Sequence, residues 1–288
     1  GYWNLRGDVE EGKLWLECAL ALDDGRDPMA RSRALLWLAM ILGTHGEGER
    51  SMVAMEESID LAQAHEDTLG IAYALTCKAF GLLHGADAID AAVTLANESQ
   101  MLFEALDVPW GVLMCQALIA EAAQRQGDWY RAKGLYEQLL GSCDQIEGHE
   151  FGTAICRHGL ASILASVGDR SQARSLFVKA MIDFDGLGDL GKVAWCLEAF
   201  GRSTEFDESE AAARLFGAAD ALRALIAVQL PIAERPDYEE AVGSLRLTMG
   251  EERFEQAWQA GRALSKSAAI AEAGALVSGT VPYTRESH

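Results

Sequence analysis

Proline is scarce in this chain, with five in 288 residues, and the prolines fall at the edges of apolar segments. Pro28 follows Asp27, a typical pair of N-cap and first helical residue, and Pro109 opens the segment that starts at Trp110. β-branched residues are also few, and no segment alternates apolar and polar residues with the period of two that marks a strand. The sequence therefore predicts an all-helical protein.

Basic residues are outnumbered by acidic ones, 24 against 44, which gives a formal net charge of −20. Such a surface repels phosphate backbones, so we expect no direct binding to nucleic acid. The longest unbroken apolar run, Ala34–Leu42, is too short for the roughly 20 residues of a membrane-spanning helix, so no membrane partner is expected. The sequence has no secretory leader and opens on Gly1, so we expect a fragment of a longer cytoplasmic protein.

Residue clusters that could support chemistry are missing. The six cysteines, at positions 18, 77, 115, 143, 156 and 196, include no Cys-x-x-Cys pair, and the six histidines have no metal-ligand spacing. We expect the cysteines to be reduced core thiols, and we expect no metal and no cofactor. No Ser-His-acid or Cys-His arrangement can be defended, so the sequence does not indicate an enzyme.

A short helix-to-helix turn recurs along the chain. Glycine tolerates the left-handed conformation that ends a helix, and aspartate caps the free N–H groups of the next one. The clear copies are Gly127-Asp128, Gly168-Asp169 and Gly7-Asp8, and the weaker ones are Gly46-Glu47 and Gly85-Ala86. They start 39, 39, 42 and 41 residues apart, taken in chain order from position 7. A constant step of this size predicts an array of stacked helical hairpins.

Each hairpin has a first helix before its turn and a second helix after it. The first helices are predicted at 28–43, 68–84, 109–125, 149–166 and 189–203, after a partial one at 1–6. The second helices are predicted at 8–23, 47–65, 86–106, 128–143 and 169–185.

Superposing the hairpins aligns small residues on the first helices. Glycine recurs at 70, 111, 152 and 191, and alanine recurs at 39, 79, 120 and 161. A small residue at a fixed position lets a neighbouring helix approach closely. The second helices share a leucine followed by an aromatic residue, at Leu14-Trp15, Leu135-Tyr136 and Leu176-Phe177. We interpret this stripe as core rather than as an aromatic binding box.

These features resemble tetratricopeptide (TPR) repeats. The step is longer than the 34-residue TPR consensus and the closing proline is missing, so HEAT-like packing stays open. After about residue 205 the repeat pattern changes, and the sequence of residues 211–265 resembles the end of the helical-repeat region of large bacterial regulators. Those proteins join a STAND-type (NB-ARC-like) ATPase, and often a LuxR-type helix-turn-helix, to such repeats.

The resemblance implies an all-α, right-handed superhelical solenoid of TPR-like hairpins with a C-terminal capping helical cluster. It implies three parts: a repeat array over 1–205, a helical cap over 206–277 that continues the array, and a flexible tail over 278–288.

Two stretches match nucleotide-binding motifs, and we interpret both matches as chance. Gly7–Lys13 lacks the Ser or Thr of a Walker A loop, Gly186–Gly191 matches Gly-x-Gly-x-x-Gly, and neither follows a predicted strand.

In TPR-like arrays the first helices line a concave groove, and the resemblance places contact positions on them. These positions are Arg33, Tyr73, Thr76, His84, Glu121, Gln124, Arg125 and His158. This mixed set suits a peptide, a protein segment or a small effector held by a few polar anchors. The alternative is that these residues are only solvated.

The function expected from the resemblance is a non-catalytic sensor and interaction arm of a transcriptional regulator. Its partners would include the ATPase and DNA-binding domains of the full-length protein, encoded outside this chain. A stand-alone scaffold that joins proteins is the alternative. An enzyme built in the groove is not expected, because no titratable cluster emerges.

Overall fold

The computed structural model describes residues 9–23, 25–44, 46–85, 88–143, 150–204, 208–231 and 234–279. Over these ranges the chain is almost entirely α-helical and contains no strand, which confirms the all-α class. No helix in the described part of the chain is long and apolar enough to cross a lipid bilayer.

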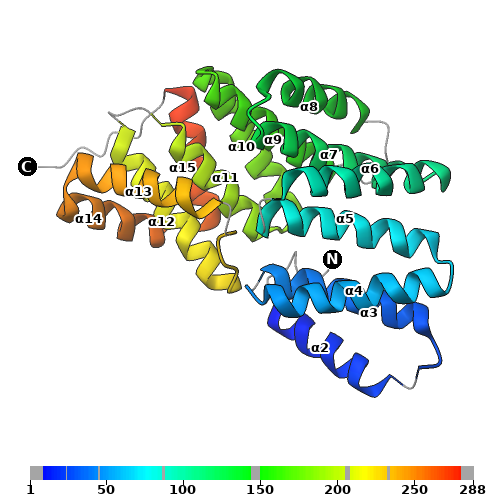
Figure 1. The fold of residues 1–288 in the computed structure, drawn as a ribbon. Helices are drawn as coiled ribbons and strands as arrows, with labels where there is room; N and C mark the ends of the chain where they lie inside the picture. The colour runs from blue at the N-terminus through cyan, green and yellow to red at the C-terminus, as the bar shows by residue number, and fades with distance from the viewer. Residues whose placement is uncertain are drawn as a thin grey trace, which may run out of the picture. The chain divides into compact units, whose positions relative to one another are not determined.

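The helices follow one another with short connections (Figure 1). They are α2 (Val9–Leu22), α3 (Pro28–Thr44), α4 (Gly48–Ala64), α5 (Thr68–Gly85), α6 (Ile89–Ala105), α7 (Pro109–Arg125), α8 (Trp129–Cys143), α9 (Glu150–Ser166), α10 (Arg170–Leu187), α11 (Leu190–Arg202), α12 (Ser209–Ile226), α13 (Arg235–Met249), α14 (Glu251–Arg262) and α15 (Lys266–Ser278). The predicted helices from 8 to 203 match α2 to α11 to within three residues at each end. The partial helix at 1–6 lies outside the described residues.

The chain divides into two compact units, with the boundary inside α9. Unit 1 comprises residues 1–156 and 226–236, and unit 2 comprises residues 157–225 and 237–288. The division into array, cap and tail rests on repeat pattern rather than compactness, and it stays a prediction.

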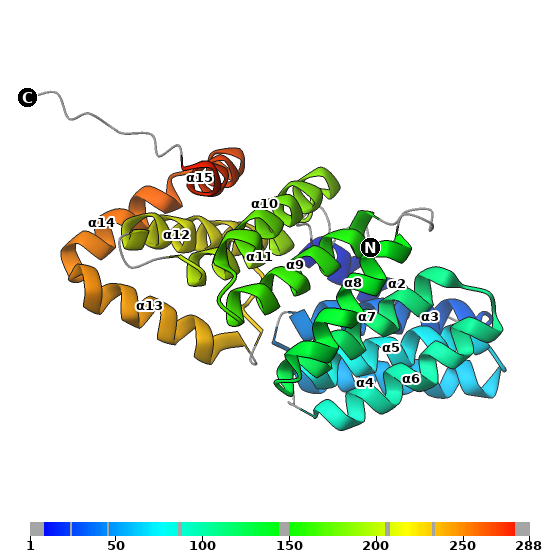
Figure 2. The ribbon, with the colours of Figure 1, turned by 90° about the horizontal axis from the view of Figure 1, so that it is seen from above.

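Unit 1 is built of hairpins that pack on one another. The pairs α3–α4, α5–α6 and α7–α8 each pack together, and α4–α5 and α6–α7 join one hairpin to the next. The first helices also meet directly, α3 with α5 and α5 with α7. Figures 1 and 2 both show α4, α5 and α6 side by side. This packing of neighbouring helices is that of a helical-repeat array.

The recurring turn works as predicted at Gly127-Asp128 and Gly168-Asp169, whereas at Gly46-Glu47 the glycine has a φ of 80° but the Glu47 side chain makes no cap hydrogen bond. Gly127 has a φ of 78°, and the Asp128 backbone N–H donates to the Ala123 carbonyl at 3.0 Å, which closes α7. The Asp128 carboxylate then accepts the Arg131 N–H at 3.1 Å and caps α8. The Gly7-Asp8 copy and Ala86 lie outside the described residues.

The same turn explains the Gly-x-Gly-x-x-Gly pattern. Gly188 ends α10 with a φ of 77°, and Asp189 caps α11 by accepting the Lys192 N–H at 2.9 Å. The motif therefore joins two helices. Lys13, from the Walker-like stretch, lies in α2 and its Nζ pairs with Glu47.

The aligned small residues lie where helices approach closely. The four alanines at 39, 79, 120 and 161 are all fully buried. A Cβ added at Gly111 would lie 2.3 Å from Cγ of Phe103 on α6, and one at Gly152 would lie 2.8 Å from Cδ2 of Leu113. Both distances are below van der Waals contact, so the prediction of close helix approach is confirmed at these positions.

The leucine-aromatic stripe is core in two of its three copies. Tyr136 and Phe177 are 3% and 1% exposed. The prediction is wrong for the first copy, because Leu14 and Trp15 are 60% and 59% exposed. α2 is the first helix of the described residues, so no preceding helix there covers this side of it, although α3 packs on its other side. Burial of a helix face depends on a neighbour, which the pattern within the helix does not supply.

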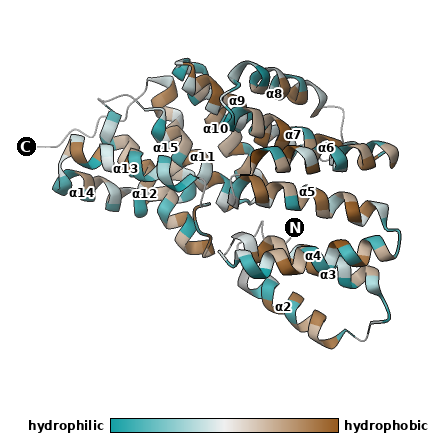
Figure 3. Cartoon of the chain, viewed as in Figure 1, coloured by the Kyte–Doolittle hydropathy of each residue, from teal (hydrophilic) through white to brown (hydrophobic). Residues whose placement is uncertain are grey.

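Unit 2 contains a helix crossing at which two backbones touch. A Cβ added at Gly217 of α12 would lie 2.2 Å from the Trp258 carbonyl oxygen, and one at Gly261 of α14 would lie 2.0 Å from the Arg214 carbonyl oxygen. Phe254, fully buried, packs beside the crossing with Ala213. Figure 3 shows that α14 is largely hydrophilic outside this contact, whereas α5 in unit 1 is mostly apolar.

Candidate functional site

The first helices of unit 1 carry pairs of residues at equivalent positions. Phe80 and His84 follow Ala79 by one and five residues on α5, and Glu121 and Arg125 follow Ala120 by the same offsets on α7. Residues four apart share one face of a helix. Because α5 and α7 pack directly on each other, the two pairs lie next to one another.

Three of the predicted contact residues form one polar cluster. Arg125 Nη2 lies 3.1 Å from His84 Nδ1, and Arg125 Nε lies 3.4 Å from Glu121 Oε1. His84 Nε2 lies 3.5 Å from Glu121 Oε2. A guanidinium can only donate, so His84 Nδ1 is the acceptor and the ring proton sits on Nε2. With a neutral imidazole, the opposite charges of Arg125 and Glu121 balance.

The cluster leaves one donor unused. His84 Nε2 is buried and makes no hydrogen bond with the described residues, since 3.5 Å to Glu121 is longer than a normal N–H···O bond. A buried donor without an acceptor costs about 1–3 kcal/mol. A shift of Glu121 towards the ring, or an acceptor brought by a ligand, would recover that free energy.

Exposed aromatic side chains lie next to His84 on α5 and on the neighbouring first helix α3. Phe80 is 40% exposed, and its ring centroid lies 4.1 Å from that of His84. Trp37 on the neighbouring α3 is 42% exposed. Between the two helices Cys77 Sγ lies 3.5 Å from Met40 Sδ. We call the set of Trp37, Phe80, His84, Glu121 and Arg125, which lie on the neighbouring first helices α3, α5 and α7, the first-helix face.

The remaining predicted residues of unit 1 are placed differently. Arg33 is exposed on α3 and lies 3.9 Å from Asp67, and Gln124 is half-buried on α7. Tyr73 packs edge-on against Phe103 with ring centroids 4.9 Å apart. These residues do not join the cluster in the distances that the structure shows.

Thr76 has a structural role in this conformation. It is 3% exposed, and its hydroxyl lies 2.8 Å from Ser99 Oγ and 3.0 Å from the Ala72 carbonyl oxygen, to which it donates. Cys115 Sγ lies 3.5 Å away. This network ties α5 to α6 and α7 inside unit 1, so Thr76 does not face solvent.

His158 belongs to unit 2 and is 3% exposed. Its ring stacks on Trp195 with centroids 3.3 Å apart, and Phe177 meets it edge-on at 5.3 Å. The Lys192 ammonium lies 4.2 Å from the centroid of the Trp195 ring. His158 is therefore packed among aromatic rings in this conformation.

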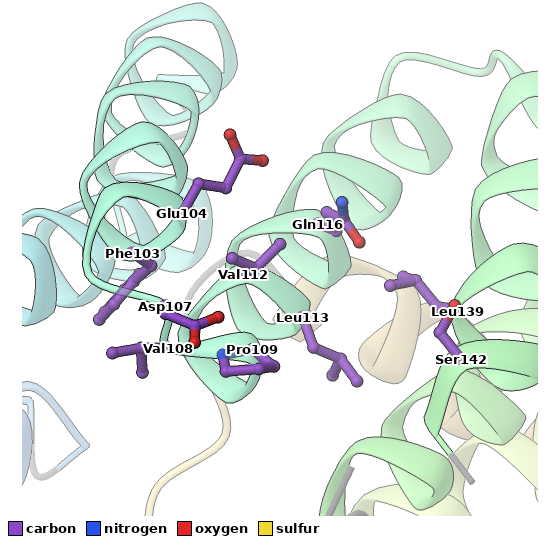
Figure 4. A pocket seen from close by; sticks show the side chains of 10 residues that line it. All are labelled: Phe103, Glu104, Asp107, Val108, Pro109, Val112, Leu113, Gln116, Leu139 and Ser142. Carbon is purple, nitrogen blue, oxygen red and sulfur yellow. The ribbon is translucent and has the colours of Figure 1, made fainter. Parts of the chain in front are cut away.

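The alignment of repeats could have found Phe80, because it shares the helix position of Glu121. Trp37 lies outside the contact positions that the TPR resemblance implies. A second feature was also missed: a hollow between the end of α6, the start of α7 and the end of α8 (Figure 4). Its lining comes from three separate segments, so no local motif indicates it.

Metal-ligating clusters and cysteine thiols were the groups most able to support chemistry in the described residues. No cluster of three or more His, Cys, Asp or Glu side chains in them could hold a metal ion. Burial raises the pKa of the Cys77 thiol to about 12 and also raises the pKa values of Cys115, Cys156 and Cys196. Thiols with raised pKa values are poor nucleophiles. Cys18 is an exception to the predicted core location, because it is exposed on α2.

Comparisons with known proteins add no identity to this picture. No protein-family model matches the chain, and no curated protein matches it significantly. The fold itself defines the class: an all-α chain whose hairpins pack as a helical-repeat array.

Proposed function

We propose that this chain is a TPR-like sensor and interaction domain of a larger bacterial transcriptional regulator, and that it performs no chemistry itself. It binds a peptide, a protein segment or a small effector across the first-helix face. It does not bind nucleic acid directly, because its net charge of −20 repels phosphates.

The observation that carries the proposal is the composition of that face. Trp37 and Phe80 are 42% and 40% exposed, and beside Phe80 lies a charge-balanced cluster with an unused His84 donor. Exposed aromatic anchors next to oriented polar groups are typical of peptide-binding surfaces.

The sensor mechanism is a population shift. A ligand that prefers one arrangement of the domain relative to an ATPase core would bias the regulator towards that arrangement. This attachment rests on the resemblance of 211–265 to bacterial regulators. The coding sequence upstream tests it, because the absence of a complete Walker A and Walker B pair there would leave the stand-alone scaffold.

The binding surface is tested by charge reversal with a matched control. Glu121→Lys reverses a charge inside the polar cluster, whereas Glu98→Lys makes the same change at an exposed site on α6. We expect the first variant to weaken binding of an identified partner at least tenfold and the second to leave it within twofold. Equal affinities, in variants with native circular dichroism, would reject the first-helix face.

A further inference from the structure

A hollow of about 370 Å³ lies within unit 1, and its lining shares no residue with the first-helix face. Figure 4 shows side chains of α6 and α8 on either side of the first turns of α7. Its apolar lining includes Val108, Val112, Leu113 and Leu139. Its volume lies at the lower end of the range for small-molecule sites, roughly 300–1,000 Å³.

The charged groups around the hollow are all of one sign. Glu104 and Asp107 line it, and no lysine or arginine does. The C-terminal ends of α6 and α8, where Phe103 and Ser142 lie, also contribute to the wall. The carbonyl end of a helix carries partial negative charge. The N-terminal end of α7, at Val108 and Pro109, lines the same hollow and carries partial positive charge. The full negative charges of Glu104 and Asp107 outweigh these partial charges, so a cation is favoured over an anion.

Both carboxylates have capacity for a ligand. Glu104 Oε1 accepts one hydrogen bond from Gln100 Nε2 at 2.7 Å, which leaves its other oxygen for a second donor. Asp107 is exposed, and its carboxylate makes no hydrogen bond or ion pair with the described residues. Its backbone has a φ of 54°, a left-handed conformation that costs a non-glycine residue about 1 kcal/mol.

We propose that this hollow binds a small amphiphilic cation, an alkyl or arylalkyl amine. The apolar part of the ligand contacts Val112 and Leu139, and its ammonium group lies between the carboxylates of Glu104 and Asp107. Charge complementarity selects the cation, and the apolar lining selects an organic amine over an inorganic ion. The proposal does not depend on the function of the first-helix face, because the two surfaces share no residue.

The test uses three probes of equal size that differ in charge. Phenethylamine is cationic, 2-phenylethanol is neutral and phenylacetate is anionic at pH 7. Binding to the ¹⁵N-labelled chain is followed by amide chemical shifts. We expect phenethylamine to bind with a Kd on the order of millimolar and to shift residues around Asp107, Val112 and Leu139. Equal binding of phenylacetate, or shifts elsewhere only, would overturn the proposal.

Variants separate the charge from the apolar lining. The double variant Glu104→Gln/Asp107→Asn should weaken phenethylamine binding roughly fivefold, the range expected for two partly exposed ion pairs. Glu98→Gln on α6, which removes a charge outside the hollow, should change it by less than twofold. Unchanged binding in the double variant, or equal loss in Glu98→Gln, would refute a specific cation site.

Filling the hollow supplies a second readout. Val112 is half-buried in its wall, so Val112→Trp should occupy the space and abolish the local shifts. If Val112→Trp has a lower melting temperature than the wild-type protein, the test rests on the Glu104→Gln/Asp107→Asn variant alone. That variant should keep the fold, because both replaced carboxylates are exposed. Persistent binding in a folded Val112→Trp protein would contradict the proposal.

Discussion

The backbone contact between α12 and α14 allows a sharp prediction about packing. In Gly261→Ala the new Cβ would lie 2.0 Å from the Arg214 carbonyl oxygen, whereas Cβ atoms essentially never approach a neighbour closer than 3.0 Å. The two helices must therefore separate by about 1 Å, the difference between these distances. The Arg214 carbonyl is held in a helix and cannot rotate away, so helices α12 and α14 must move apart along their whole contact.

The cost follows from that movement. A gap of about 1 Å removes a quarter to a half of the attraction of each atom pair across the contact, and overpacking of this kind costs about 1–3 kcal/mol, occasionally more. The replacement of glycine by alanine also stabilises the helix by about 0.5–1 kcal/mol, because alanine has the higher helix propensity. We expect a net loss of about 1–2 kcal/mol for Gly261→Ala, at the crossing that buries Phe254.

The matched control is Gly274→Ala on α15, where an added Cβ would meet nothing within 4 Å. This variant should gain about 0.5–1 kcal/mol from helix propensity alone. Thermal unfolding followed by circular dichroism should separate the two variants by roughly 5–10 °C. Equal melting temperatures would refute the backbone contact between α12 and α14.

Four further predictions test other parts of the structure. Ala120→Leu, at a fully buried position, should lower the free energy of unfolding by about 1–3 kcal/mol, whereas Ala271→Leu, at an exposed one, should change it by less than about 0.5 kcal/mol in urea titrations. Glu66→Gly should raise the melting temperature slightly, because Glu66 has a φ of 55°, and a lower value would argue against this turn. Thr76→Val should cost about 0.5–1.5 kcal/mol, because the Thr76–Ser99 hydrogen bond is lost while Ser99 keeps its bond to the Ala72 carbonyl at 2.6 Å, and a neutral result in the same titrations would reject the buried network. Burial raises the pKa of the Cys77 thiol from 9.0 to about 12, so the neutral thiol contributes stability below pH 9 that is lost as the pH rises to 12. In thermal scans between pH 8 and 10.5, Cys77→Val should therefore lose less stability than the wild-type protein. An identical loss in both proteins would contradict this cause.

The helices could be predicted because their ends are encoded locally. Gly127 and Asp128 end one helix and cap the next through contacts within a few residues, so the signal is present in the sequence. Two of the turns that lead from a second helix into the next first helix, α4 to α5 and α6 to α7, have no such glycine. Glu66 and Asp107 adopt positive φ there, which no residue preference indicates.

Burial was harder to predict because it depends on neighbours. Leu14 and Trp15 follow the core pattern of Tyr136, but the face that carries them is not covered in the described residues. The prediction of site residues is also limited by how accurately the direction of each side chain around its helix can be assigned. Each residue turns the side chain by about 100°, so positions chosen by analogy can fall on the core side, as Thr76 does at 3% exposed.

The polar cluster was accessible from the sequence because two repeats place equivalent residues side by side. His84 and Arg125 share one helix position, and packing of α5 on α7 brings them within 3.1 Å. The hollow at Asp107 was not accessible, because it combines three segments that share no repeat position. Repeat alignment thus predicts contacts between equivalent helices better than spaces between different ones.

Site-specific photo-crosslinking tests the central claim about the first-helix face most directly. Benzoylphenylalanine would replace Phe80, which is 40% exposed on α5, or Val53, which is 66% exposed on the second helix α4. The account predicts a discrete crosslinked partner from Phe80 and none from Val53, although Val53 is the more accessible site. Crosslinking from Val53 alone, or the same products from both positions, would contradict it.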